Sequence, residues 1–299
     1  MDGILCMDKP AGFTSFDVVA KLRGMLKTKR LGHAGTLDPM ATGVLPVFVG
    51  AATRACDCMS DDHKRYTAAM QLGLVTDTQD TTGTVLSTAP FAVDESAVQA
   101  ACTAFVGELR QVPPMYSAVK IDGRKLVDLA RRGVEIDRPA RPVTIYRLQI
   151  LAADYAAGRI TLDVTCSKGT YIRTLCHDIG AALGCGAALC ALRRTEAAGF
   201  TIGQAVTFER LRDLLDNGQP LPLSPTDAVF AGYPAVRLDA RCAALFSNGV
   251  RLRPEQFSAA GSDAAAPYLR VYHDDGRFLG LGRVEEGHLH VKKNFPPAL

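Results

Sequence analysis

The sequence contains no apolar run that approaches the ~18 residues a helix needs to cross a bilayer. The N-terminus carries Asp2 and Asp8 and lacks the basic region with which a secretory signal peptide begins. We therefore expect a cytoplasmic protein that makes no membrane contact. With 299 residues, of which 47% are hydrophobic, the chain is long enough for one large domain and a second small one.

Paired Cys-x-x-Cys spacing, the usual mark of a zinc site, is also absent. The nine cysteines make an odd count and are scattered between Cys6 and Cys242. This distribution predicts reduced thiols that lie mostly in the core, rather than a disulfide framework. We therefore predict no metal site.

A strong net charge is lacking as well. The formal charge of +3 is too small to indicate nucleic-acid binding by itself. The charge is unevenly distributed, however, because several basic residues and no acidic ones occur between Asp17 and Asp38. They are Lys21, Arg23, Lys27, Lys29 and Arg30. Such a patch suits phosphate binding, whereas any one of these residues taken alone is more typical of a solvated helix face.

One acidic residue is set among glycines. Asp38 stands directly before Pro39, which predicts that it caps a short helical turn whose positive end faces the carboxylate. That field would keep Asp38 ionised near neutral pH. Gly32, Gly35 and Gly43 permit tight turns and close backbone approach. The pattern fits a nucleophile in a ligand-binding loop, and it also fits an ordinary helix cap.

Hydrophobic periodicity predicts a mixture of helices and strands. The expected helices cover residues 15–27, 94–107 and 171–184, and the expected strands cover 45–49, 66–72 and 160–166. Residues 111–142, rich in Lys and Arg, are expected to form a projecting hairpin with a short helix over 125–132. Because these elements do not alternate in regular βαβ units, we predict an α+β fold.

The chain becomes proline-rich at 221–225, which places a domain boundary near residue 230. We therefore predict two domains, 1–229 and 230–299. In the second we expect a helix over 240–248 and four short strands that form a small β-barrel. The expected strands cover 250–252, 269–272, 278–284 and 288–291.

Several sequence blocks together resemble one enzyme family. The blocks are GILCMDKPAGFTS at 3–15, HAGTLDPMATGVLP at 33–46, KRY at 64–66, QVPPMYSA at 111–118 and KGTYIRT at 168–174. In this order they resemble the bacterial TruB-type tRNA pseudouridine synthases, which modify the T-loop uridine of tRNA at position 55. The resemblance implies a mixed, mainly antiparallel sheet flanked by helices, followed by a PUA-like RNA-binding β-barrel.

The resemblance also implies a reaction that needs no cofactor. Pseudouridine forms when the bond from uracil N1 to the ribose breaks and the base rejoins through C5, without redox chemistry or water. The family assigns the nucleophile or base to the position of Asp38. Arg173 matches the arginine that pairs with this aspartate and favours its charged form. An arginine in the first turn of a helix itself calls for a nearby anion.

The remaining matches concern the RNA. Tyr66 matches the aromatic residue that stacks on the flipped target base. His33 matches a residue that helps to hold the rearranged RNA loop, while Tyr171 and Leu192 match residues that line the uracil pocket. The implied partner is the T arm of tRNA. We expect no obligate protein partner and a monomeric enzyme.

Two other functions stay open at this stage. A non-catalytic tRNA-binding or tRNA-folding chaperone would use the basic residues and the C-terminal module but would not need Asp38. A hydrolase would need a thiol or a second carboxylate. Cys176 and His177 are adjacent helical residues that point about 100° apart. No acidic residue lies within twenty positions before Asp38 or eighteen after it.

Overall fold

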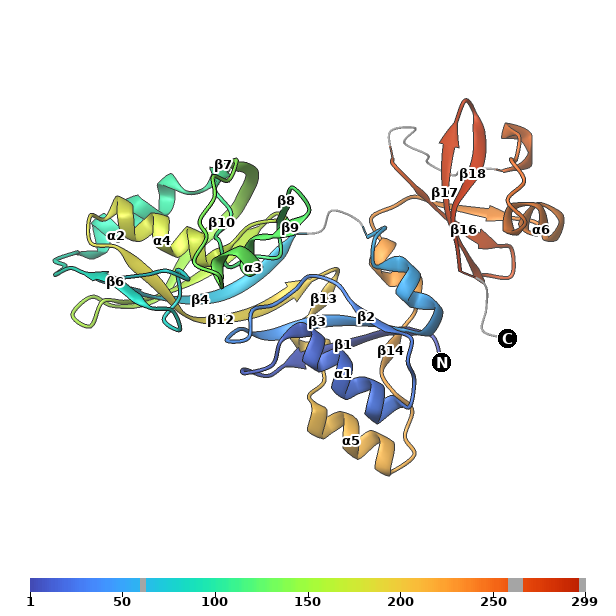
Figure 1. Ribbon diagram of the computed structural model, residues 1–299. Coiled ribbons are helices and arrows are strands. Elements are labelled where there is room, and N and C mark those ends of the chain that lie inside the picture. The colour runs from blue at the N-terminus through green and yellow to red at the C-terminus, as the bar shows by residue number, and fades with distance from the viewer. Residues whose placement is uncertain (60–62, 258–265, 296–299) are drawn as a thin grey trace.

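The computed structural model describes residues 1–59, 63–257 and 266–295, which form a large body and a smaller C-terminal body (Figure 1). The large body is built on a ten-stranded sheet and the C-terminal body on a four-stranded one. The predicted α+β class and the small C-terminal β domain are confirmed. Within the described residues, no helix combines the length and apolarity required to span a membrane.

The large sheet is mixed and mainly antiparallel. Its strands are β1 (Gly3–Lys9), β2 (Leu31–His33), β3 (Thr42–Val49), β4 (Lys64–Leu72), β7 (Gly107–Gln111), β10 (Arg141–Asp154), β11 (Arg159–Cys166), β12 (Ala187–Ala197), β13 (Phe200–Thr201) and β14 (Leu223–Ser224). They run in the order β14-β1-β3-β12-β4-β11-β10-β7, with β2 paired to β3 and β13 paired to β12. The pairing of β12 with β3 is parallel, and the other pairings are antiparallel.

Helices cover the two ends of this sheet separately (Figure 1). Helices α1 (Ser15–Leu26) and α5 (Phe208–Asp216) pack with β1 and β3 around one apolar cluster. Helices α2 (Glu95–Ala104) and α4 (Ile172–Ala182) pack with β4 and β11 around another. Each end of the sheet thus has an apolar cluster of its own beneath its helices.

Local sequence signals explain why these elements form. The Thr14 hydroxyl accepts a hydrogen bond from the Asp17 amide, and the Asp17 carboxylate accepts one from the Thr14 amide, which completes a capping box at the start of α1. Lys27, in a left-handed conformation with φ 50°, ends that helix. Alternate residues of β4, from Tyr66 to Leu72, are buried, as their spacing predicted. The helices and strands predicted for residues 1–184 are confirmed to within three residues at their ends.

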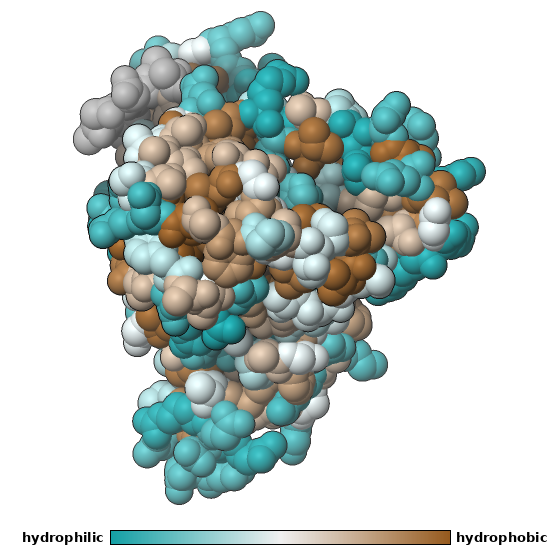
Figure 2. Space-filling view, turned by 90° about the vertical axis from the view of Figure 1, so that its left-hand side faces the viewer, coloured by the Kyte–Doolittle hydropathy of each residue, from teal (hydrophilic) through white to brown (hydrophobic). Residues whose placement is uncertain are grey.

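Two projections extend from the large sheet. One is the hairpin of β5 (Leu74–Thr76) and β6 (Val85–Thr88), and Figure 2 views the end of the molecule where it lies, with apolar and polar atoms interspersed. The other, which we call the insertion, comprises residues 112–140 with β8 (Lys120–Ile121), β9 (Arg124–Lys125) and α3 (Leu126–Ala130). The insertion has its own small core around Met115. The predicted basic hairpin and short helix are confirmed.

The C-terminal body contains β15 (Ala235–Leu238), β16 (Leu269–His273), β17 (Phe278–Glu285), β18 (His288–Asn294) and α6 (Ala240–Ser247). The strand predicted at 250–252 is wrong, because those residues contribute one isolated bridge, from Leu252 to Leu289. Strand β15 was not predicted from the sequence. The sheet order is β15-β16-β17-β18, and in the described part of the chain no pairing joins β15 to β18.

An apolar cluster joins the two bodies. Phe48 of β3 belongs to the same cluster as three phenylalanines from the last third of the chain, Phe230, Phe278 and Phe295. The ring centroids of Phe278 and Phe295 lie 5.4 Å apart, and those of Phe230 and Phe295 lie 5.9 Å apart. The short helices η1 (Gly50–Ala55) and η3 (Thr226–Phe230) meet at this contact. Packed aromatic rings of this kind hold the C-terminal body against the large one.

The parallel contact between β12 and β3 is where the two halves of the large sheet meet. It pairs Arg193 with Thr42 and Arg194 with Gly43. A Cβ atom on Gly43 would lie 2.2 Å from the Arg194 carbonyl oxygen, and Gly43 has φ +103°, so this position requires glycine. The loop that carries Asp38 enters β3 at this contact.

Candidate active site

A cleft of about 800 Å³ opens beside this contact. Its walls come from the loop before β3, the start of α4, the insertion, and strands β4 and β12. Among the residues that line it are Asp38, Tyr66, Tyr171, Arg173 and Leu192, which all come from the sequence-based candidate set. Elements far apart in sequence thus bring these side chains together. His33 is the candidate that is not among the lining residues.

The Asp38 loop is fastened by the N-terminal segment. The Ser15 hydroxyl accepts a hydrogen bond of 2.8 Å from the Leu37 amide. The wholly buried Lys9 donates from Nζ to the carbonyl oxygens of Phe13 at 2.5 Å and Pro39 at 3.3 Å. Burial lowers the pKa of Lys9 to about 8, and the neighbouring Asp38 carboxylate opposes that change. Residues 3–15 therefore shape the loop that presents Asp38.

The conformation of the loop differs from the predicted helical turn. The Ala41 amide donates to the Asp38 carbonyl at 3.1 Å, which closes a single turn over Pro39 and Met40 with no helix beyond it. The turn that follows Asp38 therefore adds no helix dipole of its own to hold the carboxylate in its ionised form. The neighbouring residues fasten the loop through specific hydrogen bonds, and these override the local preference for a helical cap.

Arg173 grips the Asp38 carboxylate with two nitrogens. Its Nε lies 2.9 Å from Asp38 Oδ2, and its Nη2 donates to Asp38 Oδ1 at 3.4 Å. The Arg173 side chain is 5% exposed, whereas that of Asp38 is 38% exposed. A forked contact of this kind fixes the carboxylate in orientation as well as position. An arginine in the first turn of a helix was expected to have an anion nearby, and that anion is Asp38.

The rest of the Arg173 guanidinium is also held. Its Nη1 donates to the Thr78 carbonyl at 2.9 Å, and its Nη2 donates to the Tyr116 carbonyl at 2.8 Å. Asp80 Oδ2 lies 3.8 Å from Nη1, and the Asp80 carboxylate accepts bonds from Thr78 and Thr82. Sequence reasoning missed Asp80, because it lies in a polar turn far from Asp38 in the chain. It is 6% exposed and is not among the cleft-lining residues, so it supports Arg173.

The surroundings of Asp38 move its pKa in two directions. Burial in the cleft raises the pKa of Asp38, and the charge of Asp80 adds to that effect. Arg173 and Lys9 oppose the rise. We predicted that a helix end would lower the pKa of Asp38. The group that lowers this pKa most is instead the guanidinium of Arg173. The guanidinium is the main group that favours the ionised carboxylate.

Tyr66 and Leu192 form the apolar side of the cleft. Tyr66, on β4, and Leu192, on β12, are 6% and 8% exposed. The two strands are paired, which places both side chains beside the Asp38 loop. Burial raises the pKa of the Tyr66 phenol, so the ring is neutral at ordinary pH. An aromatic face and a leucine here provide the surface that a planar base needs for stacking.

Tyr171 ties the cleft to the foot of the insertion. It is the N-cap residue of α4, and its amide donates to Gln111 Oε1 at 2.8 Å. The Gln111 amide group returns a bond of 3.0 Å to the Tyr171 carbonyl. This reciprocal pair fixes the end of β7 against the start of α4, two residues before Arg173.

His33 lies at the edge of this arrangement. It ends β2 opposite Val47, and its Nδ1 atom is buried without a hydrogen-bond partner among the described residues. Burial lowers the pKa of His33, and the charge of Arg194 adds to that effect. The neutral imidazole is therefore favoured, and a role in proton transfer to Asp38 has no geometric support in the cleft.

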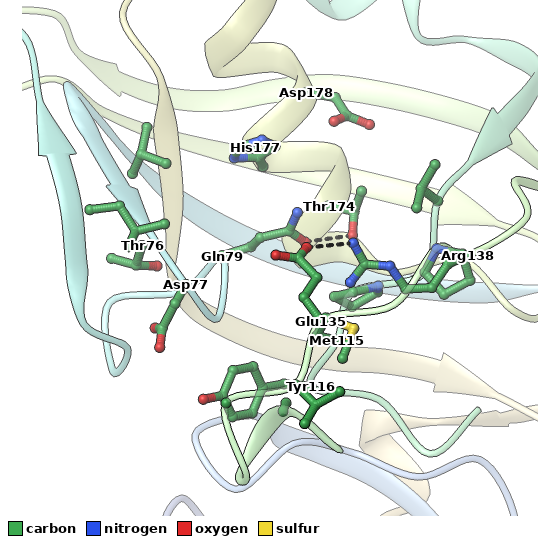
Figure 3. A pocket seen from close by; sticks show the side chains of 18 of the residues that line it. Thr76, Asp77, Gln79, Met115, Tyr116, Glu135, Arg138, Thr174, His177 and Asp178 are labelled. Carbon is green, nitrogen blue, oxygen red and sulfur yellow. Dashed lines mark hydrogen bonds and ion pairs between the residues drawn. The ribbon is translucent and has the colours of Figure 1, made fainter. Parts of the chain in front are cut away.

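A second cavity, of about 700 Å³, lies on the other side of the insertion (Figure 3). Tyr116 lines both cavities. At its centre the Thr174 hydroxyl donates to Gln79 Oε1 at 2.7 Å, and Arg138 pairs with Glu135 at 3.1 Å (Figure 3). The insertion therefore forms one wall of the cleft and one wall of this cavity.

The cysteines take no part in the cleft. Seven of the nine are buried, and all nine are free of disulfides, which confirms the predicted thiols. Cys176 is wholly buried in the core under α4, and burial raises its pKa, so it is no nucleophile. Over the described ranges, no group of three or more His, Cys, Asp or Glu side chains is arranged to hold a metal ion.

Comparison with known families matches almost the whole chain. Residues 23–172 match the model of the TruB family pseudouridylate synthase N-terminal domain. Residues 173–224 match the tRNA pseudouridylate synthase B C-terminal domain, and residues 234–293 match the pseudouridine synthase II TruB C-terminal model.

Curated relatives and solved structures agree with these matches. A tRNA pseudouridine synthase B from Burkholderia mallei (strain NCTC 10247) is 44% identical over 287 residues, which cover 96% of this chain and 94% of that protein. A protein of the same name from Cupriavidus metallidurans is 42% identical, covering 97% of this chain and 93% of that one. The structure of a Cbf5-Nop10-Gar1 complex aligns with a TM-score of 0.78 and 27% identity, covering 99% of this chain and 85% of that one.

Proposed function

This chain belongs to the TruB family of pseudouridylate synthases, and on that basis we propose its target nucleotide, the roles of its active-site residues and its partners. The protein is an isomerase that converts uridine in tRNA to pseudouridine. The target that we propose is the uridine at position 55, in the T loop. The relatives named tRNA pseudouridine synthase B, aligned over nearly their full length, support a tRNA substrate.

One observation carries the proposed chemistry. Among the described residues that line the cleft, Asp38 is the one carboxylate, and a buried arginine grips it at 2.9 Å beside an aromatic ring and a leucine. A hydrolytic glycosidase needs a second carboxylate on the reacting bond. Asp80, a second carboxylate beside Arg173, is held by Thr78 and Thr82 and does not line the cleft. The described lining of the cleft thus suits a reaction that uses one acidic group.

The proposed reaction conserves every atom of the nucleoside. The bond between uracil N1 and the ribose breaks, the base turns within the cleft, and a bond forms between C5 and the ribose. The hydrogen on C5 leaves as a proton and N1 gains one, so no oxidant or cofactor is needed. We propose Asp38 as the nucleophile and Arg173 as the group that keeps it ionised and aimed.

The base must leave its loop to reach Asp38. We propose that the uridine flips into the cleft and stacks on Tyr66, with Leu192 and Tyr171 closing the pocket around it. Base stacking on an aromatic ring contributes roughly 1–3 kcal/mol, which offsets much of the free energy needed to unstack a nucleotide. His33 lies outside the cleft, where we propose that it contacts the rearranged RNA loop.

We further propose that the enzyme acts as a monomer on the T arm, in the cytoplasm where tRNA is found. Two basic surfaces support RNA binding. One is a hollow on the insertion, lined by Lys120, Arg124, Lys125 and Arg132 together with a single acidic residue, Asp128. The other is the basic stretch of α1 and the residues after it. We propose that residues 1–229 carry catalysis and that residues 230–299 form a PUA-like RNA-binding domain.

The experiment is to incubate purified protein with unmodified tRNA transcript, without any added cofactor, and to map pseudouridine at single-nucleotide resolution. We expect one new pseudouridine, at position 55, and no free uracil. A transcript with cytidine at that position is the matched control and should remain unchanged. Release of uracil would identify a hydrolase, and tRNA binding without any change in the RNA would identify a chaperone. Either result would overturn the proposal.

A further inference from the structure

Arg194 is a buried cation that the proposed mechanism does not use. Its side chain is 0% exposed, which is unusual because arginine is almost never fully buried without a carboxylate partner. It lies on β12 at the wall of the cleft, two residues beyond Leu192. Its Nε and Nη2 donate hydrogen bonds to main-chain carbonyl oxygens, and its Nη1 atom is buried with no partner among the residues described.

The guanidinium joins the two ends of the Asp38 loop. Nε donates to the Val44 carbonyl at 2.7 Å, after the loop, and Nη2 donates to the Gly35 carbonyl at 2.8 Å, before it. The main chain of Arg194 pairs with Gly43 at the same place. The loop is thus closed across its base by one side chain, independently of the contacts that Lys9 and Ser15 make further along it.

The same side chain stands next to the stacking ring. Arg194 and Tyr66 are direct partners in the pairing of β12 with β4. The charge of Arg194 lowers the pKa of the Tyr66 phenol against the larger effect of burial. Arg194 therefore bonds to the loop that aims Asp38 and is the direct cross-strand neighbour of the residue whose ring receives the base.

We propose that Arg194 is a positioning residue of the active site, whose guanidinium holds the Asp38 loop and the Tyr66 ring in one fixed arrangement. This inference rests on the proposed function of those two residues. Lysine cannot take over the role, because its donors sit on one nitrogen, whereas the two carbonyl oxygens are bonded from two separate nitrogens of a rigid plane. A displacement of about 1 Å in the reacting groups lowers turnover roughly a hundredfold.

The test compares Arg194→Lys with Arg193→Lys. Arg193 is the matched control, because it lies next along β12 but pairs with Asp8 at 2.7 Å outside the cleft. The turnover number kcat and the Kd for tRNA are measured well below the melting temperature of each variant. We expect Arg194→Lys to lower kcat about 10–100-fold while the Kd for tRNA changes less than about twofold, since phosphate contacts elsewhere supply most of the binding. Arg193→Lys should change neither.

A second variant covers the case in which Arg194→Lys fails to fold. In Gly35→Ala the new Cβ atom would lie 3.2 Å from Arg194 Nη1, so it presses on the guanidinium without removing the charge. Gly35 has φ +68°, and Gly218, with φ +62° and nothing within 4 Å, provides the control for backbone strain. We expect Gly35→Ala, and not Gly218→Ala, to lower kcat with little change in Kd.

Two results would overturn the inference. One is a kcat within about twofold of wild type in the folded variant, and the other is an equal loss of kcat and of tRNA affinity, which would indicate a general structural role. Failure of the proposed function itself would be recognised separately, because the wild-type protein would then produce no pseudouridine.

Discussion

At the scale of single residues, Arg173 is the group that opposes the effect of burial on Asp38. Burial raises the pKa of Asp38 and the guanidinium lowers it. If catalysis requires the carboxylate, activity falls as the pH drops through that pKa. Arg173→Gln removes the opposing charge, so the pKa rises and activity is lost at a higher pH than in the wild type.

The measurement is the pH dependence of single-turnover conversion, read from the midpoint of its acid limb rather than from its height. Arg193→Gln is the control, because Arg193 pairs with Asp8 outside the cleft. A midpoint in Arg173→Gln that stays in place, or moves to lower pH, would show that Asp38 is not the titrating group.

Tyr66 gives a second prediction at this scale. Tyr66→Ala removes the stacking surface, so the reaction should slow by about 5–150-fold, which corresponds to roughly 1–3 kcal/mol of stacking. The Kd for tRNA should change less, because most affinity comes from phosphate contacts. Tyr66→Phe keeps the ring and should retain most activity. Equal losses in rate and affinity in Tyr66→Ala would contradict the stacking role.

The residues that sequence reasoning found and missed differ in one physical respect. Asp38, Tyr66 and Arg173 stand in motifs whose residue types are informative by themselves, and the structure brings them to one cleft. Asp80 and Arg194 act through contacts with residues about 95 to 160 positions away, with atoms such as the Gly35 carbonyl. The sequence around Asp80, in a turn, and Arg194, on a strand, carries no local signal of such contacts. Only the structure could reveal these two residues.

At the scale of elements, the junction of β12 with β3 is the part that tolerates least change. Gly43→Ala would place a Cβ atom 2.2 Å from the Arg194 carbonyl oxygen, at φ +103°. We expect it to lower the free energy of unfolding by roughly 2–4 kcal/mol, measured by urea denaturation. Gly107→Ala is the control, since Gly107 has φ +110° but nothing within 4 Å. Equal losses in the two variants would mean that backbone strain, and not the strand contact, explains the effect.

Elements with local signals were predictable, and those defined by distant contacts were not. The capping box at Thr14 and the alternation along β4 are encoded within a few residues, and both elements form where expected. The Asp38–Pro39 pair also predicts a cap, but Lys9 and Ser15 fasten this segment as a loop. Likewise, residues 250–252 have strand character but find one pairing partner, Leu289.

At the scale of the whole molecule, the small net charge of +3 conceals a local basic surface on the insertion. Arg124 and Lys125 are exposed there. If each contacts a phosphate, then Arg124→Gln and Lys125→Gln should each reduce the slope of log Kd against log salt by about 1. Arg159→Gln, at the exposed start of β11, is the control and should leave the slope unchanged. An unaltered slope in both insertion variants would remove the insertion from the RNA interface.

The predicted division at residues 229 and 230 stays a prediction. Sequence composition places it there, but Phe230 shares one apolar cluster with Phe48 on the N-terminal side and Phe278 on the C-terminal side. A proline-rich stretch marks a change in local composition, but it does not show which surfaces pack together in the folded protein. The order of strands in the small sheet was equally beyond prediction, because pairing depends on partners distant in sequence.

If one carboxylate performs the chemistry, the decisive variant is Asp38→Asn, measured under single-turnover conditions with saturating tRNA. We predict that conversion of uridine falls by at least about a thousandfold while the Kd for tRNA stays within about twofold. Asp8→Asn, which removes a carboxylate paired with Arg193 outside the cleft, should convert normally. Conversion by Asp38→Asn at a rate within about tenfold of wild type would contradict the account.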